Sequence, residues 1–330
     1  MLWENVAQLA FNFAASVGII FVNKLIFESF QFKFTTMMTV LHYLVTIAGL
    51  EILAVVGVYE KRDSPTTPRL VLLSAVVGMA PALNNLSLSL NNLGFYQVVK
   101  LLVTPAIVGL ESYLYGATMS PPRAAALGLV CVGVAVACVN DVDLSFGGCM
   151  AAFCWLPIAA VYKVLWSRTS KEEKWHTLAL MRRVLPLATC FLLGLVPLID
   201  PPGLRDFEWT YYRAGMVLLS GVAAFFVNWS GFLVMGACSA LAHTVLGQLK
   251  ACVIILGGWL FFAKAYPPKV LAGASLAIVS MVAYTRYNLQ EQEAKTAKTQ
   301  QAASTDATAP VDDASADEAG EALLRGDGRA

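Results

Sequence analysis

The chain has 330 residues, of which 58% are hydrophobic and only 14% are charged, and its mean hydropathy is +0.64. Soluble domains carry about 25% charged residues, so this composition excludes an ordinary soluble protein and indicates repeated membrane crossing. The net charge is +1, but residues 288–330 are acidic, and the remainder carries 19 basic against 13 acidic residues, which favours an anionic ligand.

Ten apolar segments follow one another along the chain, each long enough for the roughly 20 residues that cross a bilayer. We place them at residues 5–27, 35–58, 70–90, 91–116, 122–139, 147–166, 177–199, 213–236, 238–263 and 267–287. The junctions near Asn91 and Ala237 are so short that each predicts a tight hairpin. The sequence therefore predicts an all-α membrane protein with ten transmembrane helices and a disordered acidic tail over 288–330.

The distribution of lysine and arginine predicts that both termini are cytosolic, because cytosolic loops are enriched in these residues. On the predicted cytosolic side lie Lys61, Arg62, Arg69, Arg123, Arg168, Lys171, Lys174 and Arg286, with Arg182 and Arg183 nearby. The opposite side holds only Lys33, Arg205, Arg213, Lys264 and Lys269.

An internal repeat relates the two halves of the chain. The sequence Pro121-Pro122-Arg123 recurs 146 residues later as Pro-Pro-Lys at 267–269. Because five predicted spans, an odd number, separate the copies, the second repeat is expected to be inverted. Inverted repeats are typical of alternating-access carriers whose substrate site lies near the membrane midplane. We predict one five-helix repeat over 1–146 and an inverted one over 147–287.

A lysine inside the fourth predicted span is the strongest functional signal. A charge near the bilayer centre costs roughly 2.5–3.5 kcal/mol, so Lys100 is expected to face a cavity or a partner. Helical spacing places Tyr96, Gln97 and Thr104 on the face that carries the lysine. Pro105 lacks an N–H donor and predicts a bend just after it. This pattern predicts a polar pocket.

The ninth predicted span carries a second lysine, Lys250, with about a dozen residues on either side, too many for easy snorkelling to the headgroups. His243 and Gly247 share its helix face, and Gly247 would allow a ligand close to the backbone. We include these residues and the neighbouring Gln248 among the candidate substrate ligands.

Amides at membrane depth leave two alternatives open. Asn84, Asn85 and Asn228 lie inside predicted spans, where they either bind sugar hydroxyls or a base, or join helices by hydrogen bonds. Asn23 and Lys24 close the first span and are further candidates for substrate binding, although snorkelling and an ion pair with Glu28 explain Lys24 equally well.

Three other charged residues lie in or beside the predicted spans. Lys163 stands beside Tyr162 and Trp166, and we predict that it anchors its span at the membrane surface. Glu51 and Glu111 are the plausible acidic partners within the spans. Glu51 either pairs with one of the two buried lysines or carries a coupling proton. Two under-neutralised ammonium groups would attract a dianion such as a phosphorylated solute.

Motifs for enzymatic chemistry are missing from the sequence. It contains no nucleotide-hydrolysing P-loop, no G-x-S-x-G and no H-E-x-x-H, so we expect neither catalysis nor a metal or cofactor. We also expect no nucleic-acid partner.

Three motifs together resemble the nucleotide-sugar and triose-phosphate transporter family of the drug/metabolite transporter superfamily. They are Asn23-Lys24, Gly-Phe-Tyr-Gln-x-x-Lys at 94–100 followed by Thr104-Pro105, and Val-Leu-Gly-Gln-Leu-Lys at 245–250. The similarity covers residues 5–287. Within the family the chain most resembles the plant and algal branch that carries UDP-sugars into the Golgi, because members of that branch have an aliphatic residue directly after this lysine, as Leu101 is here.

The resemblance implies exchange of a UDP-sugar (galactose, rhamnose, xylose or arabinose) for UMP across the Golgi membrane. It implies Lys100 and Lys250 as phosphate ligands, with Tyr96, Gln97 and His243 lining the cavity. Ala251 replaces the arginine of plastid triose-phosphate translocators, and Gly-Gln-Leu-Lys replaces the Gly-Ala-Leu-Asn-Lys of GDP-mannose carriers. Both relatives are therefore disfavoured.

Three rival functions stay open at this point. They are a triose- or pentose-phosphate/phosphate exchanger of the same family, a proton-coupled metabolite exporter that uses Glu51, and a non-transporting scaffold that recruits partners through the acidic tail. For the favoured function the partners are the UDP-sugar, UMP and the lipid bilayer. The sequence leaves open the sugar and the oligomeric state, a homodimer included.

Overall fold

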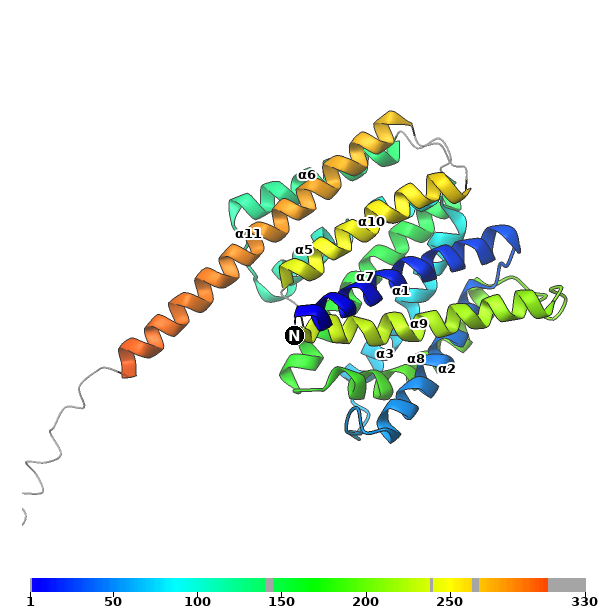
Figure 1. Cartoon of the computed structure of the whole chain (residues 1–330), viewed down its shortest axis with the longest axis horizontal. Helices are drawn as coiled ribbons and strands as arrows, with labels where there is room; N and C mark the ends of the chain where they lie inside the picture. Colours follow the sequence, from blue (N-terminus) through cyan, green and yellow to red (C-terminus); the bar gives the residue numbers. More distant parts are fainter. Residues whose placement is uncertain (1, 140–144, 238–239, 263–266, 308–330) are drawn as a thin grey trace, which may run out of the picture. The chain divides into compact units, whose positions relative to one another are not determined.

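The computed structural model describes residues 2–139, 145–237, 240–262 and 267–307, without the side chains of 231–246 and of Gln248, among others. Within these ranges the chain is helical and has no strand (Figure 1). The helices are α1 (Leu2–Ser29), α2 (Thr35–Val55), α3 (Pro68–Leu90), α4 (Leu93–Lys100), α5 (Val103–Tyr115), α6 (Pro121–Val139), α7 (Phe146–Glu172), α8 (Thr177–Ile199), α9 (Tyr211–Ala237), α10 (Ala240–Phe262) and α11 (Pro268–Ala307).

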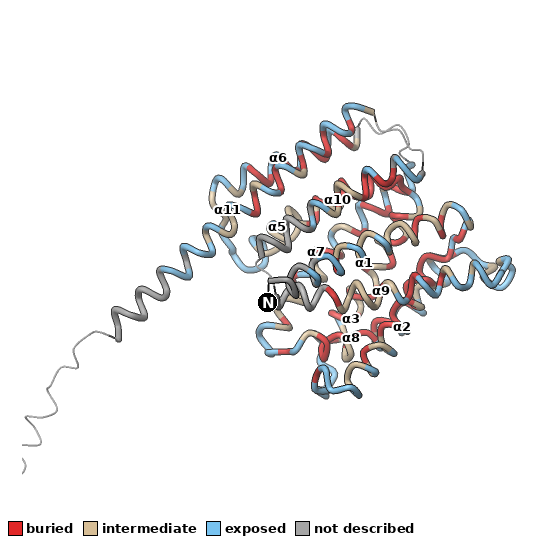
Figure 2. The backbone as a smooth tube through the Cα atoms, viewed as in Figure 1, coloured by how far each residue is buried: buried red, intermediate tan, exposed pale blue. Residues whose placement is uncertain are grey.

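The fold is that of an all-α membrane protein. Among the described residues, nine segments are long and apolar enough to cross a bilayer, with α4 and α5 together forming one of them. The ninth predicted span, 238–263, corresponds to α10, whose apolar stretch within the described residues, Leu249–Gly258, is shorter. Large apolar side chains such as Val55, Leu260 and Val279 point outward, where lipid would cover them, while buried residues gather where helices meet (Figure 2).

Helices from the two predicted repeats interleave in the bundle. α1 packs against α9 and α10, α2 against α8 and α9, and α3 against α7 and α8. A space enclosed by these helices is therefore lined by both halves of the chain. The division into inverted repeats at 1–146 and 147–287 stays a prediction.

The helix is interrupted directly after Lys100, where the sequence predicts a bend. Helix α4 ends at Lys100, and α5 begins at Val103. The backbone nitrogens of Leu101 and Leu102 bond to carbonyls three residues back, at 3.1 and 3.0 Å. Pro105 lies in the first turn of α5, where its missing N–H costs no helical hydrogen bond. The break leaves the lysine at a helix end.

Two asparagines shape the short junction between α3 and α4. The side-chain oxygen of Asn92 accepts the backbone N–H of Phe95 at 2.7 Å and so caps α4. The side-chain nitrogen of Asn91 donates to the carbonyls of Ser87 at 2.8 Å and Gly148 at 3.0 Å, which ties the junction to α7. The second predicted hairpin, near Ala237, includes residues 238–239, which lie outside the described ranges.

One end of the bundle, which we call the aromatic end, is formed by the α1–α2 and α8–α9 connections. Asp200, buried directly after α8, accepts the backbone N–H groups of Thr36 at 2.9 Å and Met37 at 2.8 Å in the first turn of α2. A carboxylate at this position also interacts favourably with the helix dipole. Beside it the rings of Phe32 and Phe207 meet edge to face, with centroids 5.1 Å apart. These contacts close the aromatic end.

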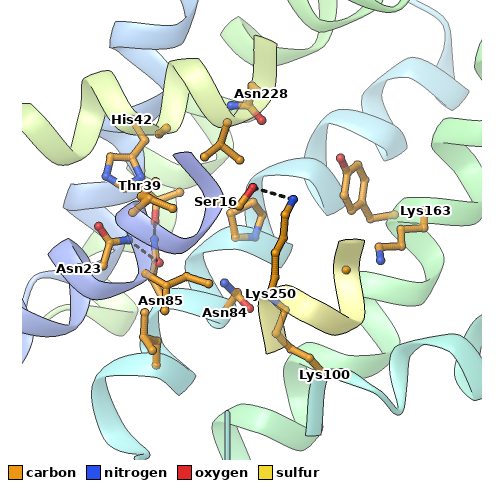
Figure 3. Close-up of a pocket in the computed structure, with 18 of the residues that line it drawn as sticks. Ser16, Asn23, Thr39, His42, Asn84, Asn85, Lys100, Lys163, Asn228 and Lys250 are labelled. Carbon is orange, nitrogen blue, oxygen red and sulfur yellow. Dashed lines mark hydrogen bonds between the residues drawn. The ribbon is translucent and has the colours of Figure 1, made fainter. Parts of the chain in front are cut away.

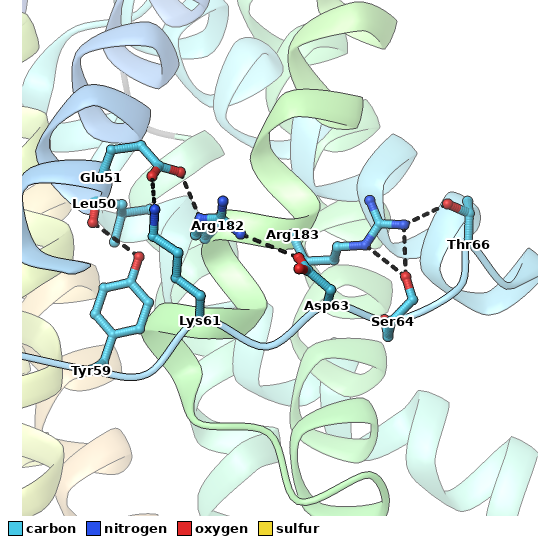
Figure 4. Close-up of polar contacts among 9 residues, drawn as sticks. All are labelled: Leu50, Glu51, Tyr59, Lys61, Asp63, Ser64, Thr66, Arg182 and Arg183. Carbon is cyan, nitrogen blue, oxygen red and sulfur yellow. Dashed lines mark hydrogen bonds and ion pairs between the residues drawn. The ribbon is translucent and has the colours of Figure 1, made fainter. Parts of the chain in front are cut away.

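The opposite end, which we call the charged end, is held by ion pairs. Glu51 near the end of α2 pairs with Lys61 at 2.7 Å and with Arg182 of α8 at 2.6 Å (Figure 4). Arg183 donates to the carbonyl oxygen of Ser64 at 3.0 Å. The connection between α2 and α3 is thereby fastened to α8.

Helices α6 and α11 cross so closely that two glycines are required. A Cβ atom on Gly133 would lie 2.6 Å from the backbone nitrogen of Ala277, and one on Gly273 would lie 2.5 Å from that of Ala137. Real Cβ contacts are essentially never this short, so any side chain would force the helices apart. Small residues permit such close approach in membrane helices.

We expect Gly133→Ala to destabilise the protein by about 1–3 kcal/mol, the usual cost of overpacking. The matched control is Gly128→Ala on the same helix, where an added Cβ would meet nothing within 4 Å. Thermal unfolding in detergent should show a lower midpoint for the first variant only. Equal midpoints for both variants would contradict the close crossing.

Helix α11 extends beyond the last predicted span. Residues 288–307 are helical, whereas the sequence analysis places the start of disorder at Asn288. The physical reason is local composition: glutamine, glutamate, alanine and lysine favour helix, and no glycine or proline intervenes before Pro310. The described part of the bundle ends at Arg286, and a second unit begins at Tyr287. Residues 308–330 lie outside the described ranges.

Candidate solute-binding cavity

A cavity of about 700 Å³ lies within the bundle (Figure 3). Its polar and charged lining residues are Ser16, Asn23, Thr39, His42, Tyr43, Asn84, Asn85, Tyr96, Gln97, Lys100, Thr104, Tyr162, Lys163, Thr177, Asn228 and Lys250. Within the described part of the chain, this lining has three lysines and no aspartate or glutamate. The cavity therefore presents uncompensated positive charge.

The cavity is not centred between the two ends of the bundle. It reaches Thr177, the first residue of α8, which lies at the charged end. The ring residues of the aromatic end and Asp200 do not contribute to its described lining. The described lining thus includes the first residue of α8 but none of the aromatic-end residues that hold the start of α2.

Lys100 is held in place by the tyrosine one turn before it. Its ammonium nitrogen donates to the Tyr96 hydroxyl at 3.3 Å and lies 5.0 Å from the centroid of the ring. The Tyr96 hydroxyl in turn donates to the side-chain oxygen of Asn84 at 3.0 Å. Tyr96 is 2% exposed, so the ring cannot move without repacking. Tyr96 and Asn84 thus position the lysine in the cavity.

Lys250 reaches across to α1. Its ammonium group donates to the side-chain oxygen of Asn12 and, at 3.1 Å, to the Ser16 hydroxyl. The side-chain nitrogen of Asn12 is itself bonded to Ser230 of α9 at 2.9 Å. The sequence analysis missed Asn12 and Ser16, although their spacing of four places them on one helix face. Among the described residues, neutral oxygens and no carboxylate bind this charge.

An amide and hydroxyl network joins α1, α2, α3 and α9 at the cavity wall. The Asn23 side chain donates to Asn85 at 3.4 Å, and Asn85 donates to the Thr39 hydroxyl at 2.9 Å. The Ser220 hydroxyl donates to the side-chain oxygen of Asn23, and the Nε2 atom of His42 lies 2.8 Å from this Ser220 hydroxyl. For Asn23 and Asn85 the hydrogen bonds favour helix joining over substrate binding, although both side chains line the cavity.

Two other amides retain free hydrogen-bonding capacity. The Gln97 side chain is 5% exposed, lines the cavity, and its nitrogen has no hydrogen-bond partner among the described residues. Asn228 also lines the cavity, and no described residue bonds to its side chain. A buried donor without a partner is costly, so Gln97 is well suited to donate to a ligand oxygen.

Lys24 does not belong to the described cavity lining. It is 2% exposed and donates to the carbonyls of Leu88 at 2.9 Å and Asn91 at 2.5 Å, while pairing with Glu28 at 3.0 Å. These contacts fasten the end of α1 to the end of α3. We assign Lys24 a structural role in place of the substrate role suggested by sequence.

Lys163 lines the cavity, a position that the sequence analysis did not expect for a residue predicted to anchor its span at the membrane surface. Helix α7 continues nine residues beyond it, roughly 13 Å along the axis. Lys163 and Lys250 extend into the space from different helices (Figure 3). Lys100 is near enough to repel both of them electrostatically.

Three further candidates of the sequence analysis lie on α10. Gly247 lines the cavity. The side chains of His243 and Gln248 lie outside the described residues, so their roles stay predictions.

Glu51 does not approach the cavity lysines. It is 40% exposed and pairs with Lys61 and Arg182 at the charged end. Arg182 also lies 3.6 Å from Asp63. The proposed pairing of Glu51 with Lys100 or Lys250 is therefore wrong, because its position on α2 directs it toward the loop.

Comparisons with known proteins show the family of the chain. Residues 6–285 match the Triose-phosphate Transporter family. The chain belongs to this family. Its members are membrane transporters, and the protein is a multi-pass membrane transporter and not an enzyme.

Relatives from Arabidopsis thaliana are similar to most of the chain. "Nucleotide-sugar uncharacterized transporter 2" is 39% identical, with 86% of this chain and 72% of that protein covered. "UDP-xylose transporter 2" is 29% identical, with coverage of 89% and 84%, and "UDP-rhamnose/UDP-galactose transporter 2" is 30% identical, with 86% and 82%. A solved crystal structure aligns with a TM-score of 0.53 at 16% identity, covering 85% of this chain and 97% of that one, and so supports the fold alone.

Proposed function

We propose that the protein is a nucleotide-sugar antiporter that exchanges a UDP-sugar for UMP across the Golgi membrane. The observation that carries the proposal is the presence of Lys100 and Lys250 in one cavity whose described lining holds no carboxylate. In a medium of low dielectric constant, such unpaired charges attract a dianion strongly. Both UMP and the diphosphate of a UDP-sugar supply two negative charges.

The size and chemistry of the cavity support a ligand of this class. About 700 Å³ falls within the roughly 300–1,000 Å³ of small-molecule sites. The free amides of Gln97 and Asn228 are available to sugar hydroxyls or a base, while the lysines hold phosphates. The printed names of the relatives include UDP-xylose, UDP-rhamnose and UDP-galactose.

Charge balance gives a physical reason for obligatory exchange. An empty cavity holds mutually repelling ammonium groups, and a bound phosphate compensates them. If compensation is needed for the conformational change, the loaded carrier switches faster than the empty one, and exchange exceeds net flux. Switching itself would rock the predicted inverted repeats, opening the aromatic end while closing the charged end. With both termini cytosolic, the charged end faces the cytosol.

The decisive experiment is exchange in reconstituted vesicles preloaded with UMP, GMP, CMP or inorganic phosphate. We expect uptake of UDP-sugars from UMP-loaded vesicles and little from the others. Uptake driven only by GMP would overturn the uridine assignment. Triose-phosphate uptake driven by inorganic phosphate would instead support the phosphate-exchanging alternative of the same family.

We expect Glu51→Gln to retain UDP-sugar/UMP exchange, because the carboxylate is paired at the charged end and does not line the cavity. Removing exposed ion pairs costs about 0–1 kcal/mol each, so only a small loss of thermal stability should follow. Initial exchange rates measured with and without a pH gradient test this prediction. Abolished transport together with loss of the gradient effect would restore the proton-coupled exporter.

A further inference from the structure

Lys163 is a charged cavity residue that has no role in the proposed exchange, in which Lys100 and Lys250 hold the phosphates. Its side chain is accessible within the cavity and has no hydrogen-bond or ion-pair partner among the described residues. Lys100 is bonded to Tyr96 and Lys250 to Asn12 and Ser16, so Lys163 differs from both. A charge held inside a membrane protein without a partner is costly, and such residues are usually functional.

The number of charges identifies what the third lysine would bind. Three ammonium groups face the cavity, and the described lining offers no carboxylate to neutralise them. The diphosphate of a nucleotide sugar supplies two negative charges, which leaves one lysine without compensation. A solute with a third anionic group would neutralise all three.

The surroundings of Lys163 indicate the sugar end of the solute. Tyr162 and Trp166 on the same helix also line the cavity, and their rings lie 6.0 Å apart. Flat aromatic faces offer apolar surface against which a sugar ring packs, with the polar groups left for hydrogen bonds. The third charge is therefore expected on the sugar and not on a longer phosphate chain.

We propose that Lys163 is a third anion-binding residue and that the preferred substrate is a nucleoside diphosphate sugar bearing a carboxylate, a UDP-uronic acid. This inference rests on the proposed function and names its substrate class. It makes Lys163 a specificity-determining residue, and the neutral UDP-sugars named for the relatives would be weaker substrates here.

The test compares two solutes that differ only at C6, UDP-galacturonic acid and UDP-galactose, in UMP-loaded vesicles containing the full chain. The wild type should show a KM about tenfold lower for the uronic acid, as expected for one additional charge pair of about 1.4 kcal/mol. Lys163→Gln should bring the ratio of the two KM values close to one, and Lys163→Arg should keep it. Lys171→Gln, on the exposed end of the same helix, is the matched control and should keep the wild-type ratio.

Several outcomes would overturn the inference. Equal KM values in the wild type would do so, and so would an unchanged ratio in Lys163→Gln. Competition by UTP as strong as that by the uronic acid would show that phosphate supplies the third charge. If Lys163→Gln does not fold, the ratio of the two KM values in the wild type and in Lys163→Arg still tests the inference. Exchange of UDP-galactose without any preference refutes the uronic acid alone, whereas no exchange of any nucleotide sugar refutes the proposed function as well.

Discussion

Lys100→Gln and Lys250→Gln should each lower kcat/KM for UDP-sugar/UMP exchange by about 100-fold or more. Removing one partner of a buried charge interaction typically costs about 3–5 kcal/mol, and both lysines are expected to contact the same phosphates. Initial exchange rates over a range of substrate concentrations provide the measurement.

The matched control is Lys33→Gln, whose lysine is exposed in the connection between α1 and α2. It should exchange at the wild-type rate. Lysine-to-arginine variants at 100 and 250 should retain part of the activity, since they keep the charge but change its geometry. If either glutamine variant transports every phosphorylated solute normally, the cavity lysines are not the phosphate ligands, and the proposed function fails.

Asp200→Ala should destabilise the protein by about 2–3 kcal/mol, which is the second-largest effect that we expect. The change leaves the backbone N–H groups of Thr36 and Met37 without acceptors in a buried position and removes a favourable charge from the start of α2. Asp200→Asn should cost less, because the amide keeps one acceptor oxygen. Thermal unfolding in detergent provides the measurement.

Asp206→Asn is the control for this prediction, since Asp206 lies exposed in the same connection. Its unfolding midpoint should equal that of the wild type. The Asp200 variants should also favour conformations with an open aromatic end, because the cap holds that end shut. Equal unfolding midpoints for Asp200→Ala and the wild type would show that the Asp200 cap does not stabilise the aromatic end.

Together the two ends suggest how the carrier cycles. Asp200 joins α8 to the start of α2, and Glu51 joins the end of α2 to Arg182 of α8. With α2 and α8 fastened at both ends, we expect them to move as one body. A cycle that opens the aromatic end would then have to move α1 and α9 relative to this pair, or break the cap.

Much of the fold follows from local properties of the chain. Apolar segments of sufficient length predict the spans, and Pro105 predicts the break after Lys100, because a residue without an N–H donor is favoured in the first turn of a new helix. The positions of Lys100 and Lys250 far from the ends of their predicted spans could also be predicted from sequence, because they depend only on counting residues. The helix over 288–307 was not predicted, although its composition favoured it.

Helical periodicity in the sequence could not predict which face of each helix meets the cavity. That face depends on helices that are distant in sequence. Lys24 and Lys163 are both lysines near aromatic or acidic residues, yet the first is bonded to Leu88 and Asn91, and the second faces the cavity. Glu51 is directed to Arg182 by the packing of α2 against α8, 131 residues apart in sequence. The chain's own pattern thus determined the spans, the bend and two deep charges, because hydropathy and proline act locally. Tertiary packing decided which charges are paired and which stand free in the cavity, because a partner for a buried charge must come from another helix.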